Sequence, residues 1–246
     1  MVLRLLIVLA LLLPVACTPV ADVKKDASVH ETLGFSYLQE GNPTKALKEF
    51  LLAVEDDPEN PDIRSGLAQA YHRKKAYELA EGQYLKALEY SHGDPKIRNN
   101  LGALYLDMQR WEDALRHFRL AADNLLFGSP EVARTGMAVA QIKLGKYIDA
   151  VESCQRALQI NPQYPQARLY LGEAYDALDK PDLAIVEYRK AVVFVPNYLE
   201  AHYRLGMSYM RQKKMKEARD EFSRVIDIAP ESDRGRLASQ YLKLLK

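Results

Sequence analysis

Residues 99–124 read NNLGALYLDMQRWEDALRHFRLAADN, and this stretch decides the fold of the chain. Gly102 is followed by Tyr105, and then by Ala114 and Phe118 on a second apolar segment. The spacing of Ala114 and Phe118 places both side chains on one face of a helix with 3.6 residues per turn. The stretch therefore predicts two antiparallel helices joined by a tight turn.

The same marks return along almost the whole chain with a period of 34 residues and one step of 36. They comprise a leucine with a small residue (Leu33-Gly34, Leu67-Ala68, Leu171-Gly172, Leu205-Gly206), an alanine (Ala46, Ala80, Ala184, Ala218) and an aromatic residue (Phe50, Tyr84, Tyr188, Phe222). A further unit is weaker, because Cys154 occupies its aromatic position. The predicted units are residues 27–60, 61–94, 95–130, 131–164, 165–198 and 199–232.

These marks resemble the tetratricopeptide repeat, and the resemblance covers residues 27–232. It implies an all-α fold, a right-handed superhelix (α-solenoid) of six helix pairs. One pair cannot bury its apolar face alone, so neighbouring pairs must stack and share a continuous core. Within a pair, Gly102 is expected to face Ala114. Residues 233–246 are predicted to form a capping helix, with one apolar stripe formed by Leu237, Ala238, Tyr241, Leu242 and Leu245.

The start of the chain resembles a bacterial lipoprotein signal. A short basic segment precedes an apolar run at residues 5–13, which is shorter than the about 20 residues of a membrane-spanning helix. Val15-Ala16-Cys17 matches the small residues and invariant cysteine that end such a signal. The resemblance implies cleavage of residues 1–16 and lipid attachment to Cys17. Residues 17–26 lack helical periodicity and are predicted to form a lipidated tether. The alternative is a plain signal peptide in which the cysteine occurs by chance.

The residue after the cysteine is Thr18 and not aspartate. By resemblance to the sorting rule of enterobacterial lipoproteins, this implies transfer to the outer membrane, with the chain on the periplasmic side. Several acyl chains on Cys17 would anchor the protein stably, whereas a single chain binds a membrane only marginally.

No pattern of catalytic residues is evident, and we expect no enzyme activity, no cofactor, no small-molecule substrate and no metal site. The net charge of +1 argues against nucleic acid as a partner, because nucleic-acid binders normally carry a strongly basic face. The sequence contains no phosphate-binding or nucleophile motif. None of the five histidines lies three or four residues from another, so no helical metal pair is formed. His30 and His202 occupy a repeat position that holds arginine elsewhere, which indicates a structural role.

In tetratricopeptide arrays the first helices of the units line a concave face, and positions 5, 9 and 12 of each unit tend to point into it. We predict a protein-binding groove at Phe35, Leu38, Gln69, His72, Asn99, Leu106, Val139, Ile142, Tyr203, Met207 and Met210. Most of these residues are apolar, and exposed apolar patches usually mark an interaction site. The alternative for each is packing against a neighbouring first helix. Position 9 carries no asparagine, so the sequence does not predict a clamp for a C-terminal carboxylate.

A lipoprotein signal followed by six such repeats resembles the type IV pilus biogenesis/stability lipoproteins, the pilotins. The local resemblance lies in Asn99-Asn100-Leu101-Gly102, in Arg110-Trp111-Glu112-Asp113-Ala114, and in the elongated exit through Ala121–Glu131. It implies that the chain binds secretin subunits in the periplasm, escorts them to the outer membrane and promotes their assembly into a ring. The alternative is a general periplasmic scaffold for peptidoglycan or polysaccharide export machinery.

Overall fold

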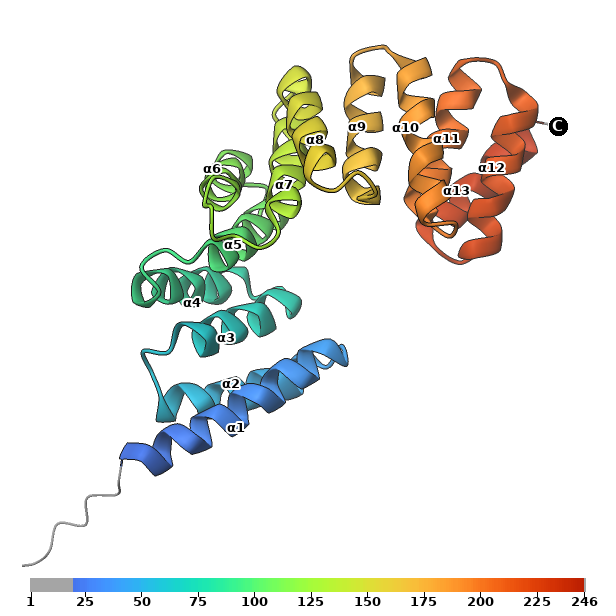
Figure 1. The fold of residues 1–246 in the computed structure, drawn as a ribbon. Helices are drawn as coiled ribbons and strands as arrows, with labels where there is room; N and C mark the ends of the chain where they lie inside the picture. The colour runs from blue at the N-terminus through green and yellow to red at the C-terminus, as the bar shows by residue number, and fades with distance from the viewer. Residues whose placement is uncertain (1–19, 246) are drawn as a thin grey trace, which may run out of the picture.

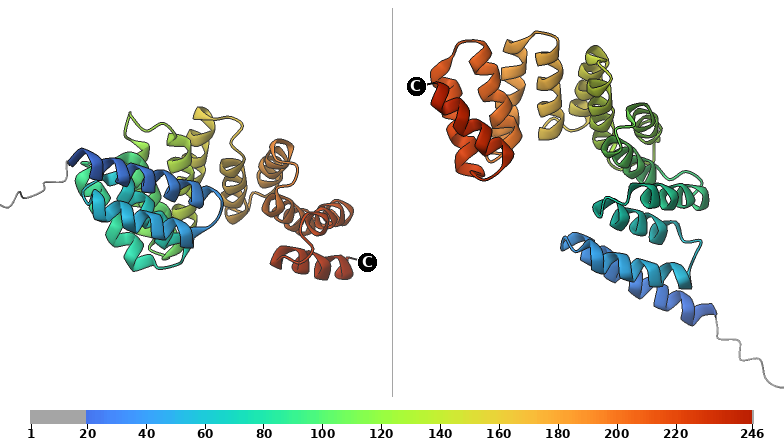
Figure 2. Two further views of the ribbon diagram at one scale, coloured as in Figure 1. Left: turned by 90° about the horizontal axis from the view of Figure 1, so that it is seen from below. Right: turned by 180° about the vertical axis from the view of Figure 1, so that it is seen from behind.

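The structure is a computed structural model that describes the backbone of residues 20–245 and the side chains of residues 26–245. The predicted signal peptide at residues 1–16 and Cys17 lie outside the described residues. Helices stack as antiparallel pairs into an open arc, with α1 and α13 at its two ends (Figure 1). Two further views show the arc from below and from behind (Figure 2). The predicted all-α superhelix with a C-terminal capping helix is confirmed.

Each repeat contributes a first and a second helix. The first helices are α1 (Val20–Gln39), α3 (Pro61–Arg73), α5 (Pro95–Asp107), α7 (Pro130–Lys143), α9 (Pro165–Ala177) and α11 (Leu199–Arg211). The second helices are α2 (Pro43–Asp56), α4 (Tyr77–Tyr90), α6 (Trp111–Ala122), α8 (Tyr147–Ile160), α10 (Pro181–Phe194) and α12 (Met215–Ile228). The last element is α13 (Asp233–Leu244).

Local sequence signals fix where the first helices begin. Proline stands in the first turn of α3, α5, α7 and α9, where its missing N–H costs no helical hydrogen bond. The Oδ1 of Asn60 accepts hydrogen bonds from the backbone N–H groups of Asp62 and Ile63 at 3.0 and 3.2 Å. Asp94 caps α5 in the same way. These contacts satisfy backbone donors that a helix start leaves unpaired.

The turn inside each helix pair has the same backbone conformation in all six repeats. One residue of each turn has a left-handed φ between 56° and 74°: Gly41, Lys75, Gln109, Gly145, Asp179 and Lys213. The next residue donates its N–H to a carbonyl at the end of the first helix, as Ala76 does to Tyr71 at 3.0 Å. This closes the helix in the Schellman manner. The non-glycine residues at this position adopt a conformation that is unfavourable for a side chain.

In repeat three, the aromatic residue of the second helix packs between two glycines. A Cβ atom on Gly102 would lie 3.0 Å from the ring of Phe118, and one on Gly136 of the next repeat would lie 2.5 Å from it. The three atoms nearest to this position on Gly102 all belong to the ring of Phe118, and the expected approach of Ala114 stays a prediction. Side chains of a helix point back towards its N-terminus, so the ring of Phe118 covers the preceding turn.

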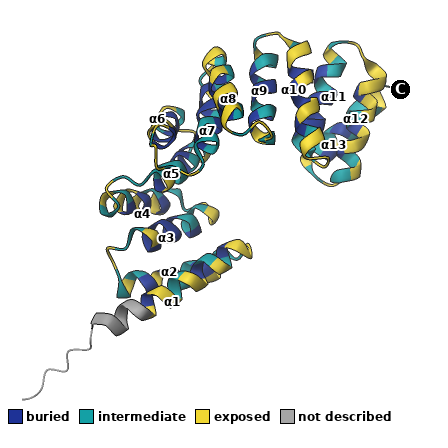
Figure 3. Ribbon diagram, viewed as in Figure 1, coloured by how far each residue is buried: buried dark blue, intermediate teal, exposed yellow. Residues whose placement is uncertain are grey.

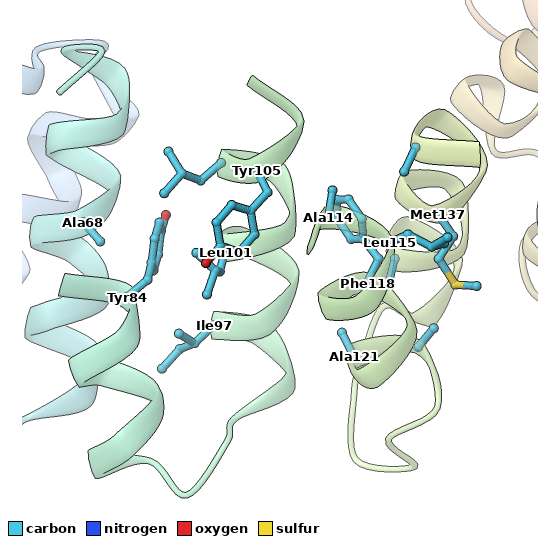
Figure 4. Packing of buried hydrophobic residues seen from close by; sticks show 14 of the residues in the cluster. Ala68, Tyr84, Ile97, Leu101, Tyr105, Ala114, Leu115, Phe118, Ala121 and Met137 are labelled. Carbon is cyan, nitrogen blue, oxygen red and sulfur yellow. The ribbon is translucent and has the colours of Figure 1, made fainter. Parts of the chain in front are cut away.

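The core is continuous from one repeat to the next. Figure 4 shows Tyr84 of α4 beside Leu101 of α5, and Phe118 of α6 near Met137 of α7. All four side chains belong to one buried cluster that joins repeats two, three and four. Burial is therefore shared between neighbouring repeats, as stacking of incomplete units requires.

The start of α1 departs from the sequence prediction. A non-helical tether is predicted for residues 17–26, whereas residues 20–26 form the first turns of α1. No proline or glycine interrupts this stretch, so the helix can propagate through it. Ala27 is buried against Ala53 and Ile63, and this contact holds the beginning of the helix against the next two helices.

The capping helix α13 covers the last repeat. Ser232 caps it by accepting a hydrogen bond at Oγ from the N–H of Gly235 at 3.0 Å. Tyr241 stacks on Phe222 of α12 with the ring centroids 5.1 Å apart. Ala238 is fully buried in the same cluster. Without this helix the apolar face of the final repeat would be open to solvent.

Candidate protein-binding groove

The first helices form the inner face of the arc. Each contacts the first helix of the next repeat, as α7 contacts α9, while the part of the chain that the structure describes shows no contact between successive second helices. Counted from the start of each unit, position 13 is exposed in all repeats: Gln39, Arg73, Asp107, Lys143, Ala177 and Arg211. Positions 6, 9 and 13 lie on one helix face. Figure 3 shows how exposed and buried residues alternate along the helices.

The first hollow on this face lies between repeats two and three. It encloses about 430 Å³, and its lining includes Gln69, His72, Asn100 and Asp107. The Nε2 of His72 lies 2.7 Å from the Oδ2 of Asp107, which joins α3 to α5. The guanidinium of Arg73, at the same edge, donates a hydrogen bond to the carbonyl of Leu38 at 2.7 Å. This part of the groove is polar and braced across neighbouring repeats.

Two adjoining hollows, of about 220 and 570 Å³, lie between repeats four and six. Val139, Ile142 and Tyr170 supply apolar surface to the smaller hollow. Lys143 and Glu173 line both hollows. Apolar surface thus lies beside charged groups, which suits a segment that carries both apolar and charged side chains.

A network of ion pairs braces this part of the groove. Arg204 of α11 contacts Glu173 of α9 at 2.5 Å and Glu200 of its own helix at 2.7 Å. Arg234 of α13 contacts Glu200 at 2.7 Å. Burial raises the pKa of Glu173, and Arg204 counteracts this rise in part. These ion pairs connect repeat five, repeat six and the capping helix on one side of the groove.

The histidines at position 4 are structural. The Nδ1 of His30 lies 2.7 Å from Glu49, and that of His202 lies 2.6 Å from Glu221. Arg168, at the same position, contacts Glu187 at 2.7 Å. In each case position 4 of the first helix is tied to position 23 of the second helix in its own repeat. This is the role that the repeat position indicates for His30 and His202.

Several predicted groove residues line the hollows. Gln69 and His72 belong to the first hollow, Val139 to the smaller of the other two, Met207 to the larger and Ile142 to both. They come from repeats two, four and six and share the inner face of the arc. Contact of these residues with a partner stays a prediction.

Leu38 lies in the core instead of the groove, and Tyr203 is largely buried but contributes to the lining of the larger hollow. Leu38 is 3% exposed and packs in the cluster of Phe50, and Tyr203 is 7% exposed. Tyr241 of the capping helix lies against Tyr203 with ring centroids 6.5 Å apart. Position 5 is also buried in other units, at Ser65, Thr135 and Leu169. It therefore belongs to the packing face of the first helix.

The remaining predicted residues are half-buried. Phe35 meets the ring of Phe50 edge-on at 5.0 Å, Leu106 packs beside the core of repeats two to four, and Met210 packs in the cluster under α13. The Oδ1 of Asn99 is buried and has no hydrogen-bond partner among the described residues.

Positions 6 and 13 also line the groove, although the sequence pattern does not predict them there. Asn100, Tyr170 and Arg204 at position 6 line the hollows, as do Arg73 and Lys143 at position 13. The sequence carries a signal for position 13, because the residue there is charged in four of the six repeats, at Arg73, Asp107, Lys143 and Arg211, and unpaired charges are unfavourable at a packed position.

The part of the chain that the structure describes holds neither of two other kinds of site, a metal centre or a membrane-spanning helix. Among the described residues, no group of three or more His, Cys, Asp or Glu side chains could hold a metal ion. No helix among residues 20–245 is long and apolar enough to cross a membrane. Cys154 is buried, and burial raises the pKa of its thiol far above the ordinary value, so it behaves as a small apolar residue.

Comparison with known families agrees with this architecture. A profile of the tetratricopeptide repeat matches residues 32–96 and 99–165, and two further profiles of the repeat match residues 141–193 and 199–232. The chain therefore belongs to the tetratricopeptide repeat family, whose stacked helices serve as surfaces for protein partners.

The most informative relatives are type IV pilus proteins. The type IV pilus assembly protein PilF of Pseudomonas aeruginosa is 27% identical over 154 residues, which are 62% of this chain and 60% of that protein. The structure of P. aeruginosa PilF matches with a TM-score of 0.75 and 19% identity, over 89% of this chain and 99% of that one. PilW, a widely conserved type IV pilus biogenesis factor, matches with a TM-score of 0.79 and 18% identity, over 87% and 98%. The predicted resemblance to pilus biogenesis proteins is confirmed.

Proposed function

We propose that the chain is an outer-membrane lipoprotein that binds a protein partner in its groove and promotes assembly of a type IV pilus secretin. The observation that carries the binding role is the inner face of repeats four to six, where Val139 and Ile142 adjoin Lys143 and Glu173. The likeness in sequence to a pilus assembly protein supports the choice of partner.

The groove favours a partner segment that presents an apolar side chain next to a charged one. Burying an apolar side chain contributes about 1.5–3 kcal/mol, so two or three such contacts decide occupancy. Charges at the rim orient the segment and select against the wrong partner. Lys143 and Arg211 are exposed at this rim and are suited to carboxylates of the partner.

The test replaces two residues on the inner face of α7. Val139→Asp places a negative charge on an apolar part of the groove, and Lys143→Glu reverses the charge at its rim. Neither substitution changes the buried alanines of that helix. We expect loss of secretin from a pull-down with the lipidated protein, fewer secretin rings and more secretin monomers. Ile148→Asp, on the outer side of α8 and 74% exposed, is the matched control and should change none of these.

The outcome also separates this proposal from the general scaffold. Unchanged rings in the groove variant, with circular dichroism showing full helicity, would contradict the secretin assignment. Capture of peptidoglycan or polysaccharide export proteins by the wild type, and their loss in the same variant, would support the scaffold instead.

Anchoring is tested separately at Cys17. Cys17→Ser removes the thiol that would carry lipid, so the protein should leave the outer-membrane fraction while its helicity stays unchanged. Fractionation with the outer membrane as before would show that another feature of the chain retains it there.

A further inference from the structure

The outer face of α10 differs from that of every other second helix. Leu183, Val186, Val193 and Phe194 are exposed on it, and Val193 is 73% exposed. The residues that correspond to Val186 in the other repeats are Lys48, Gly82, Arg116, Glu152 and Asp220. Those that correspond to Val193 are Glu55, Glu89, Asp123, Gln159 and Asp227. At these two positions, repeat five alone carries an apolar side chain.

This face is also hollowed. A depression of about 310 Å³ is lined by Val186, Arg189, Lys190, Val193 and Phe194. Contiguous exposed apolar surface of this kind marks an interaction site on a protein. It lies on the side of the array opposite the groove, so groove binding leaves it uncovered.

The pattern along α10 fits a second helix of the same sequence. The outer face carries Leu183, Val186, Lys190 and Val193, which are spaced by three, four and three residues. This spacing is typical of the contact residues between two packed helices. Asp182 stands at the N-terminal end of this face and is exposed, and the exposed Arg189 and Lys190 stand in its C-terminal half. An antiparallel copy would bring each acidic end against a basic half.

We infer that a second copy of the chain packs on this face, with the two α10 helices antiparallel about a two-fold axis. Leu183 of each copy lies opposite Val193 of the other. Val186 lies opposite Lys190, whose apolar stem covers it. The ammonium of Lys190 contacts Glu187 of its own helix at 2.7 Å and has further N–H groups to donate to Asp182 of the other copy. Every contact occurs twice, as a two-fold interface requires.

The dimer is weak in free solution and responds to crowding on a membrane. One helix pair buries less than the roughly 1,200 Å² of a standard stable interface. Copies held on one surface by lipid would experience a much higher effective concentration. The interface itself uses no groove residue, so it is independent of the proposed secretin binding.

Sedimentation velocity of the full chain with Cys17→Ser tests the inference without a membrane. We expect a monomer–dimer equilibrium that shifts towards dimer as the concentration rises to about 200 µM. Val186→Asp should raise the dimer dissociation constant at least about tenfold, because it places a charge in an apolar seam. Leu79→Asp, at the repeat position of Leu183 but on α4 and 56% exposed, should leave the constant unchanged.

Cross-linking tests the register. In the Cys17→Ser chain, Val186→Cys with Lys190→Cys should form disulfide-linked dimers on oxidation, since the two positions face each other across the axis. Each single cysteine should cross-link far less, because its own counterpart lies too far away for a disulfide. A chain that stays monomeric throughout, a dimer that survives Val186→Asp, or single cysteines that cross-link as well as the pair would overturn the inference.

Discussion

Gly66 of the second repeat lies so close to Phe50 of the first that a Cβ atom on it would sit 2.3 Å from Cε1 of the ring. On its other side the ring meets Gly34, where a Cβ would lie 2.7 Å from Cζ. Phe50 is fully buried between these two glycines. The two glycines therefore determine how closely neighbouring repeats approach. Protein interiors are densely packed, so an added methyl group at either glycine would push the helices apart.

Gly66→Ala should destabilise the protein by about 1–3 kcal/mol, since the added methyl group forces the Phe50 ring or the helices to move. Gly82→Ala is the matched control. Gly82 is exposed in α4 with no atom within 4 Å of its would-be Cβ, so alanine should stabilise that helix by about 0.5–1 kcal/mol. Urea unfolding followed by circular dichroism measures both, and two changes of the same sign would contradict the packing described.

Arg168→Ala should lower the free energy of unfolding by about 3 kcal/mol. Its guanidinium contacts Glu187 at 2.7 Å, and the two side chains are only 13% and 10% exposed, so the substitution leaves a buried carboxylate without this partner. Arg156→Ala breaks the exposed pair with Glu152 and should cost less than about 1 kcal/mol. Comparable losses in the two variants, measured by urea unfolding, would show that burial does not set the difference.

Acid should destabilise the array through His117. Burial, helped by Arg116 and Arg98, lowers the pKa of His117 to about 4 from 6.5. Between these values the unfolded chain binds a proton that the folded chain does not, so stability falls as the pH decreases. The free energy of unfolding of the wild type should therefore fall between about pH 7 and pH 5, and in His117→Gln this fall should be smaller by about 1–2 kcal/mol.

His202 should act in the opposite direction. Burial alone would lower its pKa, but hydrogen bonds with Glu221 and the carbonyl of Pro196 raise it. The folded state then keeps a proton that the unfolded state releases, so this contribution is present below pH 6.5 and is lost as the pH rises through the folded pKa. His202→Gln should flatten the fall in stability above pH 6.5, and an unaltered slope in unfolding experiments would exclude this role.

Lys75→Gly should stabilise the turn of repeat two by up to about 1 kcal/mol. Lys75 has a φ of 60°, which glycine adopts without the steric cost that a side chain incurs. Gly41→Ala, at the same position in repeat one with a φ of 74°, should do the reverse. Thermal melts of both variants measure the pair of effects, and stabilisation by the alanine would show that the turn conformation is wrong.

Much of the architecture follows from the sequence. The period of the alanine and aromatic marks gives the helix pairs and their order, and Pro61 and Asn60 show where one of the first helices begins. These signals act over a few residues, because capping, proline and helical periodicity depend on neighbours along the chain. The capping helix can be predicted from the sequence for the same reason, since its apolar stripe follows the helical period.

The residues that line the groove are harder to predict from the sequence, because they depend on how far each first helix is rotated about its own axis. Consecutive residues of a helix differ by about 100° in direction, so a modest rotation moves position 5 into the core and position 13 into the groove. Tyr203 illustrates this, since most of it is covered by Tyr241 of α13, a helix that begins thirty residues later in the sequence.

The sequence by itself determined the repeats, the helix pairs and the absence of a recognisable catalytic motif. Only the tertiary structure decided that α1 begins at Val20, that Gly102 faces Phe118, and that Val193 on α10 is open to solvent. The physical reason is that helix formation follows local periodicity, whereas which side of a helix is covered depends on contacts between residues that lie a repeat or more apart in the chain.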